Sequence, residues 1–347
     1  MPVIPEKKGR FVALDYLRGF FIIVIIVDHL NRWPSFLEVI SGRGELWSSA
    51  AEGFVIISGL LLGYIRGFKD RDKSLKSVSL IVLKRALILY VWEVITTITL
   101  TVVTWYGSFK GAVAYVPIPQ GDWATLLQQA ITLQYTSILI HFLYLYAIFL
   151  AFSPLVIWLL RRSFWWLILI VSTLLWLIGF LLQIEVLQWQ ILFFIPATAG
   201  FYLEKILHWL LSLKDIIRRV GGITIVMVTV TTITISMLDL LPEASDSFNR
   251  TPLMIGRILI AFLWFSGLLI ITWRIVPWLK KYGDWLLTPF GTRSLSVYIV
   301  HGIPLMLFSL FIPLYDNIWL NTFLGIGVVL VVWGILKIPL VAKIVPR

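Results

Sequence analysis

Arginine and histidine side chains interrupt the first strongly apolar segment of the sequence. Arg18 and His29 lie between Asp15 and Leu30, where a helix inside a bilayer would ordinarily carry neither a cation nor an imidazole. Eleven residues of α-helix turn through about 1,100°, within about 20° of three whole turns, and rise about 16 Å. The two side chains therefore share one face at different depths, and the imidazole could serve as a general base.

Several polar residues fall at the same depth as His29: Asp28, Glu52, Gln190 and Arg257. A general base needs a carboxylate that fixes its tautomer and stabilises its protonated form, so we expect Glu52, or Asp28, to orient His29. Arg257 or Gln190 would then stabilise an oxyanion. The structural alternative is that His29 only reaches an aqueous boundary while Glu52 pairs with Arg257.

A second polar group falls at the depth of Arg18 and is rich in cations: Asp15, Arg18, Lys84, Arg85, Arg293 and Ser294. Several cations at one level suit a phosphate-bearing ligand, which arginine grips through two parallel hydrogen bonds. Arg18 also has a structural alternative, because Asp15 could pair with it three residues away on the same helix.

A polar stripe on the segment near 290–312 links the two depths. Ser294 and His301 are seven residues apart, about 20° from two whole helical turns, and Tyr298 lies on the same face. We expect Tyr298 and His301 to contact the substrate. Packing through interhelical hydrogen bonds, typically about 0.6 kcal/mol each, is the alternative. Gly59, Gly63 and Gly67 form a ridge that predicts close helix packing.

The absence of cysteine excludes disulfides, thiolate metal sites and an acyl intermediate on cysteine. The four histidines, at positions 29, 141, 208 and 301, have no metal-ligand spacing, so we expect no metal. The sequence also has neither a P-loop nor a Gly-x-Ser-x-Gly elbow. Nucleotide hydrolysis and α/β-hydrolase chemistry therefore have no support.

The elements that position these residues are predicted to be membrane-spanning helices. Hydrophobic residues make up 59% of the 347 residues and charged residues only 14%, more apolar than a soluble domain. We expect an all-α polytopic membrane protein with about ten helices in one domain, residues 1–347. Windows of about 20 apolar residues give the segments 11–30, 47–66, 80–104, 132–160, 163–182, 189–208, 220–240, 253–273, 290–312 and 319–341. The first reads as a retained helix because no signal-peptide cleavage pattern follows it.

Lysine and arginine are distributed unevenly between the two sides of these segments. One side holds only Arg32, Arg43, Lys110 and Arg250. Arg18 and Arg257 lie inside segments, which leaves 23 of the 29 on the other side. The positive-inside rule then predicts that both termini are cytoplasmic and that His29 lies near the outer surface. The net charge of +11 follows topology, so it does not indicate nucleic acid, although the basic run 66–73 could also touch anionic lipid.

The stretch near 105–131 is long for a connection and falls on the extracytoplasmic side. We expect it to cover the cleft for the acceptor substrate. The oligomeric state cannot be read from the sequence.

Several of these motifs resemble a known family. Arg18, ten intervening residues and His29 are similar to the Arg-x10-His motif of the acyltransferase-3 superfamily of membrane acyltransferases. Asp28-His29, the run 51–59, Gly291–Leu295 and Trp189-Gln190 resemble its OpgC branch, named for periplasmic glucan succinyltransferases. One departure is in 135–141, where no acidic residue follows Thr136, and this puts the succinyl specificity in question.

The resemblance implies a bacterial inner-membrane enzyme that moves an acyl group, of acetyl or succinyl type, from cytoplasmic acyl-CoA to a carbohydrate or glycolipid hydroxyl outside. His29 would be the essential histidine and Arg18 the arginine of the motif. Two alternatives remain: a transporter of a small or glycan-linked substrate, whose intramembrane charges would look alike, and an N-acyltransferase for an amino sugar. Direct transfer and an acyl-histidine intermediate both stay open.

Overall fold

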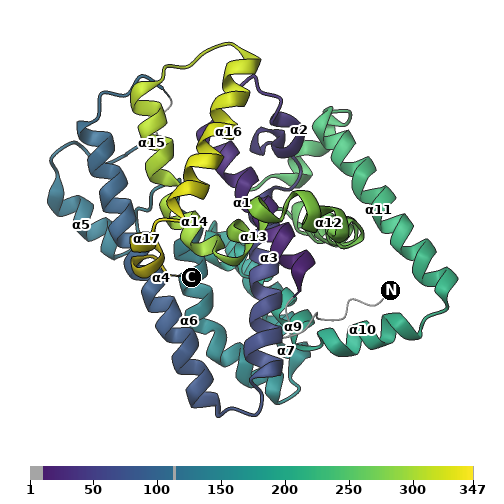
Figure 1. Cartoon of the computed structure of the whole chain (residues 1–347). Coiled ribbons are helices and arrows are strands. Elements are labelled where there is room, and N and C mark those ends of the chain that lie inside the picture. The colour runs from purple at the N-terminus through teal and green to yellow at the C-terminus, as the bar shows by residue number, and fades with distance from the viewer. Residues whose placement is uncertain (1–10, 112–114, 347) are drawn as a thin grey trace.

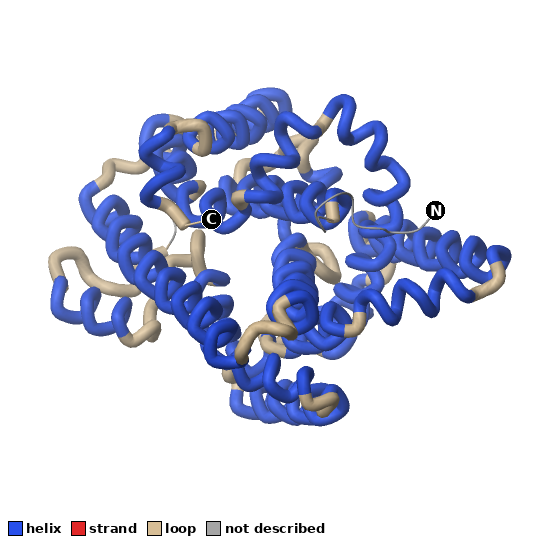
Figure 2. Tube along the Cα trace, turned by 60° about the horizontal axis from the view of Figure 1, so that its bottom comes forward, coloured by secondary structure: helices blue, strands red, loops and turns tan. Residues whose placement is uncertain are grey.

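The computed structural model describes residues 11–111 and 115–346, and within them it contains helices and no strand (Figure 2). The predicted all-α class is therefore confirmed for this part of the chain. The longer helices are α1 (Val12–Leu30), α3 (Ala50–Leu62), α4 (Leu75–Tyr106), α6 (Phe142–Arg161), α7 (Trp165–Leu182), α9 (Ile191–Phe201), α11 (Asp215–Met237), α12 (Ile255–Tyr282), α15 (Gly302–Phe311) and α16 (Ile318–Ile335). The shorter ones are α2 (Glu38–Ser41), α5 (Trp123–Ile131), α8 (Glu185–Trp189), α10 (Leu203–Ser212), α13 (Asp284–Thr292), α14 (Ser294–Val300) and α17 (Pro339–Ile344), with η1 (Gly42–Gly44), η2 (Gly63–Lys69) and η3 (Pro242–Phe248).

Eight helical stretches in the described residues are long and apolar enough to cross a membrane. The stretch Glu185–Phe201 bends by 65° into α10, and this pair would make a ninth crossing. The remaining segment of the ten that we expected, 11–30, forms the 19-residue helix α1, which carries Asp15, Arg18 and Asp28. The protein is thus a multi-pass membrane protein, while the count of ten and the location of the termini stay predictions. The basic residues Lys7, Lys8 and Arg10 lie outside the described residues.

Helix α1 occupies the middle of the molecule, where α3, α12, α13, α14 and α16 contact it (Figure 1). Two glycines, one on each helix, let the backbones of α1 and α13 contact each other where the helices cross. A Cβ on Gly291 would lie 1.9 Å from the carbonyl oxygen of Asp15, and one on Gly19 would lie 2.4 Å from that of Leu287. This crossing holds the α1 residues around Arg18 against α13.

The glycine ridge of α3 and η2 packs on α9, as predicted. A Cβ on Gly59 would lie 2.0 Å from the carbonyl oxygen of Phe193, and one on Gly63 would lie 1.8 Å from that of Ala197. Backbone contact of this kind is how membrane helices pack without a hydrophobic driving force between them. It fixes α3, which carries Glu52, Phe54 and Ser58 on the turns beside α1.

The peripheral helices are much less buried than the centre. Only 17% of the apolar window in α7 and 6% of that in α11 are buried. In Figure 1, α11 lies at the edge of the molecule, and its main packing partner is α12. An apolar helix with so little burial is suited to a lipid environment.

The stretch 105–131 folds back on neighbouring helices. It contains α5, and the Trp105 ring packs edge-to-face on Trp123 at 5.3 Å between centroids. Tyr90 of α4 donates a hydrogen bond to the carbonyl oxygen of Ile131 at 2.7 Å, and the backbone N–H of Gly111 donates to Ser309. Residues 112–114 lie outside the described residues.

The basic run 66–73 forms a compact turn between α3 and α4. Asp70 accepts hydrogen bonds from Arg66 and makes an ion pair with Lys73, each at 2.8 Å, and Arg161 donates to the carbonyl oxygens of Asp70 and Lys73. Although burial raises the pKa of Asp70, its contacts with Lys73 and Arg66 bring that pKa below the ordinary value.

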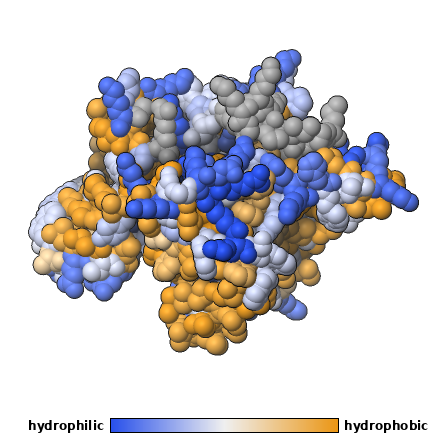
Figure 3. Space-filling model, turned by 90° about the horizontal axis from the view of Figure 1, so that it is seen from below, coloured by the Kyte–Doolittle hydropathy of each residue, from blue (hydrophilic) through white to orange (hydrophobic). Residues whose placement is uncertain are grey.

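Seen from below, hydrophilic side chains gather at the middle of the molecule between apolar surfaces (Figure 3).

Candidate functional site

The site is built around two histidines from helices far apart in sequence. His29, near the end of α1, lies with its Nδ1 2.9 Å from Nε2 of His301, which separates α14 from α15. The rings stack at 5.2 Å between centroids and 21° between planes. His301 is fully buried, and its Nδ1 is 2.7 Å from the carbonyl oxygen of Tyr298.

The hydrogen-bond chain fixes the tautomers of both rings. A carbonyl oxygen only accepts, so Nδ1 of His301 must donate to Tyr298. In neutral His301 the Nε2 atom then accepts, and Nδ1 of His29 must be its donor. This leaves Nε2 of His29 with a free lone pair, and it makes no hydrogen bond with any described residue. His301 is therefore the group that orients His29. From the sequence we expected His301 to contact the substrate instead.

Glu52 has a different partner from the one expected. Its Oε1 accepts a hydrogen bond from Nε of Arg257 at 2.5 Å, and its Oε2 accepts from the backbone and hydroxyl of Ser49. Both oxygens of this fully buried carboxylate are thus engaged, and the predicted pairing of Glu52 with His29 is replaced by the structural alternative. Ser49 and Glu52 form a capping box that begins α3.

Arg257 reaches from α12 to hold two loops as well as Glu52. Its Nη1 donates to the carbonyl oxygens of Leu46 and Phe248, at 3.2 and 3.1 Å. Its Nη2 is buried and has no hydrogen-bond partner among the described residues.

Asp28 and Gln190 also lack the contacts that were expected of them. Among the described residues Asp28 makes no hydrogen bond with either histidine, and its Oδ1 is buried without a partner. Its carboxyl carbon lies 3.9 Å from where a Cβ on Gly44 would be. Gln190 donates through Nε2 to the carbonyl oxygens of Ser172 and Leu187, so this amide joins α7 to α8.

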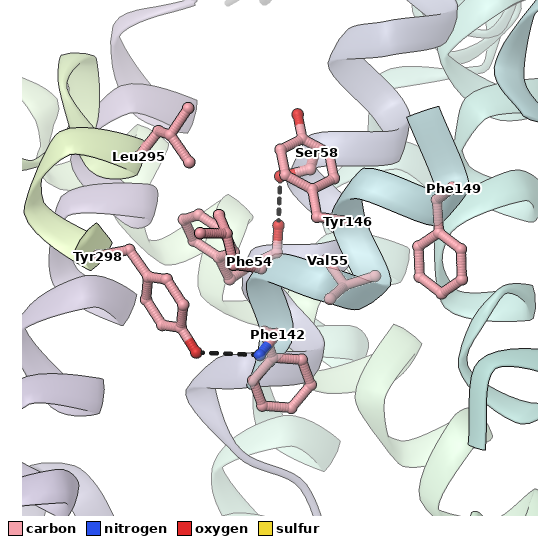
Figure 4. A pocket seen from close by; sticks show the side chains of 9 residues that line it. Phe54, Val55, Ser58, Phe142, Tyr146, Phe149, Leu295 and Tyr298 are labelled. Atoms are coloured by element: carbon pink, nitrogen blue, oxygen red, sulfur yellow. Dashed lines mark hydrogen bonds between the residues drawn. The ribbon is translucent and has the colours of Figure 1, made fainter. Parts of the chain in front are cut away.

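An apolar cavity lies between α3, α6 and α14. Its lining residues are Phe54, Val55, Ser58, Phe142, Leu143, Tyr146, Phe149, Leu295 and Tyr298. Tyr298 and Phe142 mark one end of this cavity and Leu295 and Ser58 the other (Figure 4). The Tyr298 ring lies 5.2 Å from that of His301, so the first end adjoins the histidine pair.

Arg18 lies toward the other end of the cavity. It is near enough to Asp15, Arg85 and the cavity residue Tyr146 to interact with them electrostatically. Its Nη1 makes one long hydrogen bond, 3.4 Å, to the carbonyl oxygen of Gly291, and its Nε is buried without a partner among the described residues. The guanidinium thus retains donors that a ligand could use.

Among the described residues, Lys84, Arg293 and Ser294 make no hydrogen bond with Arg18. Arg293 donates to the carbonyl oxygen of Leu336 at 2.9 Å, and so ties α13 to the end of α16. Ser294 is buried, whereas Lys84 is exposed on α4.

A larger, polar cleft of about 1300 Å³ opens on the His29 side of the molecule. Its walls come from residues 38–47, the end of α11, the segment 245–250 and Arg257. None of its lining residues belongs to the described part of 105–131, and the expectation that this stretch covers the acceptor cleft stays a prediction. The rings of Trp47 and Phe248 stack in the wall at 4.2 Å between centroids.

Arg250 contacts both the polar cleft and a wall residue of the apolar cavity. It was not among the site residues that we predicted from the sequence. It lines the polar cleft, and its guanidinium lies 5.0 Å from the ring centroid of Phe142, which lines the apolar cavity. Its charge also acts on His29 and Tyr298. The sequence did hold a signal, because Arg250 is one of few cations on the predicted outer side.

A second imidazole network adjoins the cavity wall and was also missed. Nδ1 of His141 is 2.8 Å from the Thr136 hydroxyl, and Nε2 is 2.7 Å from Oε2 of Glu185. Tyr144 donates to the same carboxylate oxygen at 2.9 Å. The short spacing between Thr136 and His141 was the one part of this network that the sequence could have indicated.

Among the described residues no group of three or more acidic or histidine side chains could hold a metal ion.

The fold and the site together define a multi-pass helical membrane protein with a histidine pair beside an apolar cavity. The chain belongs to the OpgC protein family, whose model matches residues 10–342. Membership of this family indicates a membrane acyltransferase. No curated protein and no solved structure matches the chain.

Proposed function

We propose that the protein is an integral membrane O-acyltransferase. It transfers an acyl group from cytoplasmic acyl-CoA to a hydroxyl of a carbohydrate or glycolipid on the extracytoplasmic side, with His29 as the general base. The observation that carries this proposal is the histidine pair beside the apolar cavity, where the ring of His301 lies 5.2 Å from that of Tyr298. Arg250 of the polar cleft lies 5.0 Å from the ring centroid of Phe142, which lines the same cavity. OpgC family membership supports the reaction class.

The donor would occupy the apolar cavity and the acceptor the polar cleft. Arg18, whose donors are largely unused, would bind phosphate groups of acyl-CoA at the inner end of the cavity, with Arg85 adding positive charge. The apolar walls suit the uncharged pantetheine arm, and its thioester would then reach the Tyr298 end. The cleft presents carboxylates and cations that suit polyol hydroxyls.

The reaction needs one proton acceptor and one oxyanion donor. Nε2 of His29 takes the acceptor's hydroxyl proton while the oxygen forms a bond to the thioester carbonyl carbon. Tyr298 already accepts a hydrogen bond from the N–H of Phe142 at 3.2 Å, so its own O–H is directed elsewhere and would donate to the oxyanion. The C–S bond then breaks, and the protonated His29 returns the proton to the leaving thiolate. The products are an ester and free CoA.

The test is acyl transfer by the purified protein, wild type beside His29→Gln. Removal of a general base lowers the rate by about 10²–10⁴-fold, while acyl-CoA binding should persist because Arg18 lies about three turns away. His208→Gln is the matched control, because His208 is exposed on α10 far along the chain from the site. Full activity of His29→Gln would contradict the proposal.

The same preparations separate the two alternatives. A transporter would move substrate across vesicles without forming any covalent product. An N-acyltransferase would form an amide that resists mild alkali, whereas the ester proposed here is cleaved.

A further inference from the structure

Arg250 lies against two aromatic rings. Its guanidinium lies 5.0 Å from the centroid of Phe142 and 5.5 Å from that of Trp189. Both rings are largely buried, so they are firm supports. Arginine stacked on aromatic faces is held by the attraction of its charge to the ring quadrupole.

The hydrogen-bonding capacity of Arg250 is unused. Within the part of the chain that the structure describes, its side chain makes no hydrogen bond and no ion pair, although a guanidinium has five N–H donors. The two other arginines that line the polar cleft are engaged: Arg43 pairs with Glu38 at 2.8 Å and Arg257 with Glu52. Arg250 is therefore the cleft arginine with free donors among the described residues.

The nearby carboxylates do not neutralise Arg250 by contact. Its charge acts on Glu52 and Glu185, but Glu52 is bound by Arg257 and Ser49, and Glu185 by His141 and Tyr144. A cation that is stacked, unpaired and open to a polar cleft is prepared for an anionic ligand, because little ordering remains when the ligand binds.

We propose that Arg250 binds a carboxylate or phosphate-type anion carried by the substrate that reacts at His29. This inference rests on the proposed function and deepens it, since it makes Arg250 a specificity-determining residue. The anion could belong to the acyl group, as a terminal carboxylate that passes the Phe142 end of the cavity. It could equally belong to an acidic acceptor sugar in the cleft.

Four substrate combinations distinguish these sources. Acetyl-CoA and succinyl-CoA are each paired with a neutral gluco-oligosaccharide and an oligosaccharide of glucuronic acid, and kcat/KM is measured for wild type, Arg250→Gln, Arg250→Lys and Arg274→Gln. In Arg250→Gln the preference for the charged substrate over its neutral counterpart falls by about 10–100-fold, the value of a charge-assisted hydrogen bond. Arg250→Lys retains part of the preference. Arg274 is the control, because it is an exposed arginine that also lies over an aromatic ring, that of Trp273, and lines neither the cavity nor the cleft.

The combination that loses preference identifies the source of the anion. If succinyl over acetyl is lost, Arg250 reads the acyl group; if glucuronate over glucose is lost, it reads the acceptor. An equal loss with all four combinations, or an unchanged preference, overturns the proposal.

Equilibrium binding keeps this test separate from the proposed function. Succinyl-CoA and the glucuronate oligosaccharide are titrated into wild-type protein and Arg250→Gln without turnover. Weaker binding of a charged probe by Arg250→Gln, together with no transfer by wild type, would support the anion site while rejecting the acyltransferase. Equal binding by both proteins, or no binding of either charged probe to wild type, would reject the anion site.

Discussion

The pair His29–His301 and the pair Glu52–Arg257 both join helices that are far apart in the sequence, but they differ in what they leave free. Both oxygens of Glu52 are occupied by Arg257 and Ser49. His29 has one ring nitrogen oriented by His301, and the other makes no hydrogen bond with a described residue. A polar residue inside a membrane protein whose donors and acceptors are all occupied is structural. One that keeps a free donor or acceptor can react.

The largest expected difference between the two pairs is in the free energy of unfolding of their variants. Glu52→Gln leaves Arg257 as an uncompensated buried charge, so it should destabilise the protein by about 3–5 kcal/mol. His29→Gln breaks no ion pair and should change stability far less. Denaturant unfolding in detergent measures both, and a destabilisation of His29→Gln equal to that of Glu52→Gln would remove the distinction.

A smaller effect is expected for His301, which acts through His29. His301→Ala removes the acceptor of the His29 Nδ1 proton and should lower kcat by about 10–100-fold, at the low end of general-base effects. His301→Gln retains an acceptor oxygen and should restore part of the rate, with KM for acyl-CoA unchanged in both variants. Equal loss in the two variants would indicate that His301 serves packing alone.

The same chain predicts the direction of pH dependence. Protonation of Nε2 of His29 removes the lone pair that accepts the hydroxyl proton, so transfer should fall as pH falls and level off as pH rises. A pH–rate profile on saturating substrates measures this acid limb. Its absence would argue against an imidazole base.

Much of this arrangement could be predicted from the sequence, because membrane helices and the Gly59–Gly63 ridge leave strong local signals. The proximity of His29 and His301 could not, since the chain gives no measure of which helices meet across 272 positions. The choice of partner for Glu52 failed for the same reason. Glu52 forms a capping box with Ser49 at the start of α3, and its other oxygen pairs with Arg257 of the distant helix α12.

Arg18 should show an effect on donor binding alone. Arg18→Gln removes charge-assisted donors to a phosphate and should weaken acyl-CoA binding by about tenfold. Lys69→Gln, a cation in the basic turn after α3, is the control. Unchanged binding in Arg18→Gln would move the donor site elsewhere.

The smallest effect is expected for the helix cap beside Glu52. Ser49→Ala removes one hydroxyl from the capping box and should reduce stability by about 1 kcal/mol, without altering the rate of transfer. Thermal unfolding and the transfer assay on one preparation measure both quantities. A lower rate at full stability would mean that this region takes part in catalysis.

The most direct test of the central claim is transfer across a membrane by reconstituted protein. Labelled acyl-CoA is enclosed in proteoliposomes and an oligosaccharide acceptor is supplied outside, with wild type beside His29→Gln. We expect acylated oligosaccharide outside the wild-type vesicles and none above background with His29→Gln, although both proteins bind acyl-CoA. Product formation by His29→Gln at the wild-type rate, or by wild type only when donor and acceptor share one side, would contradict the account.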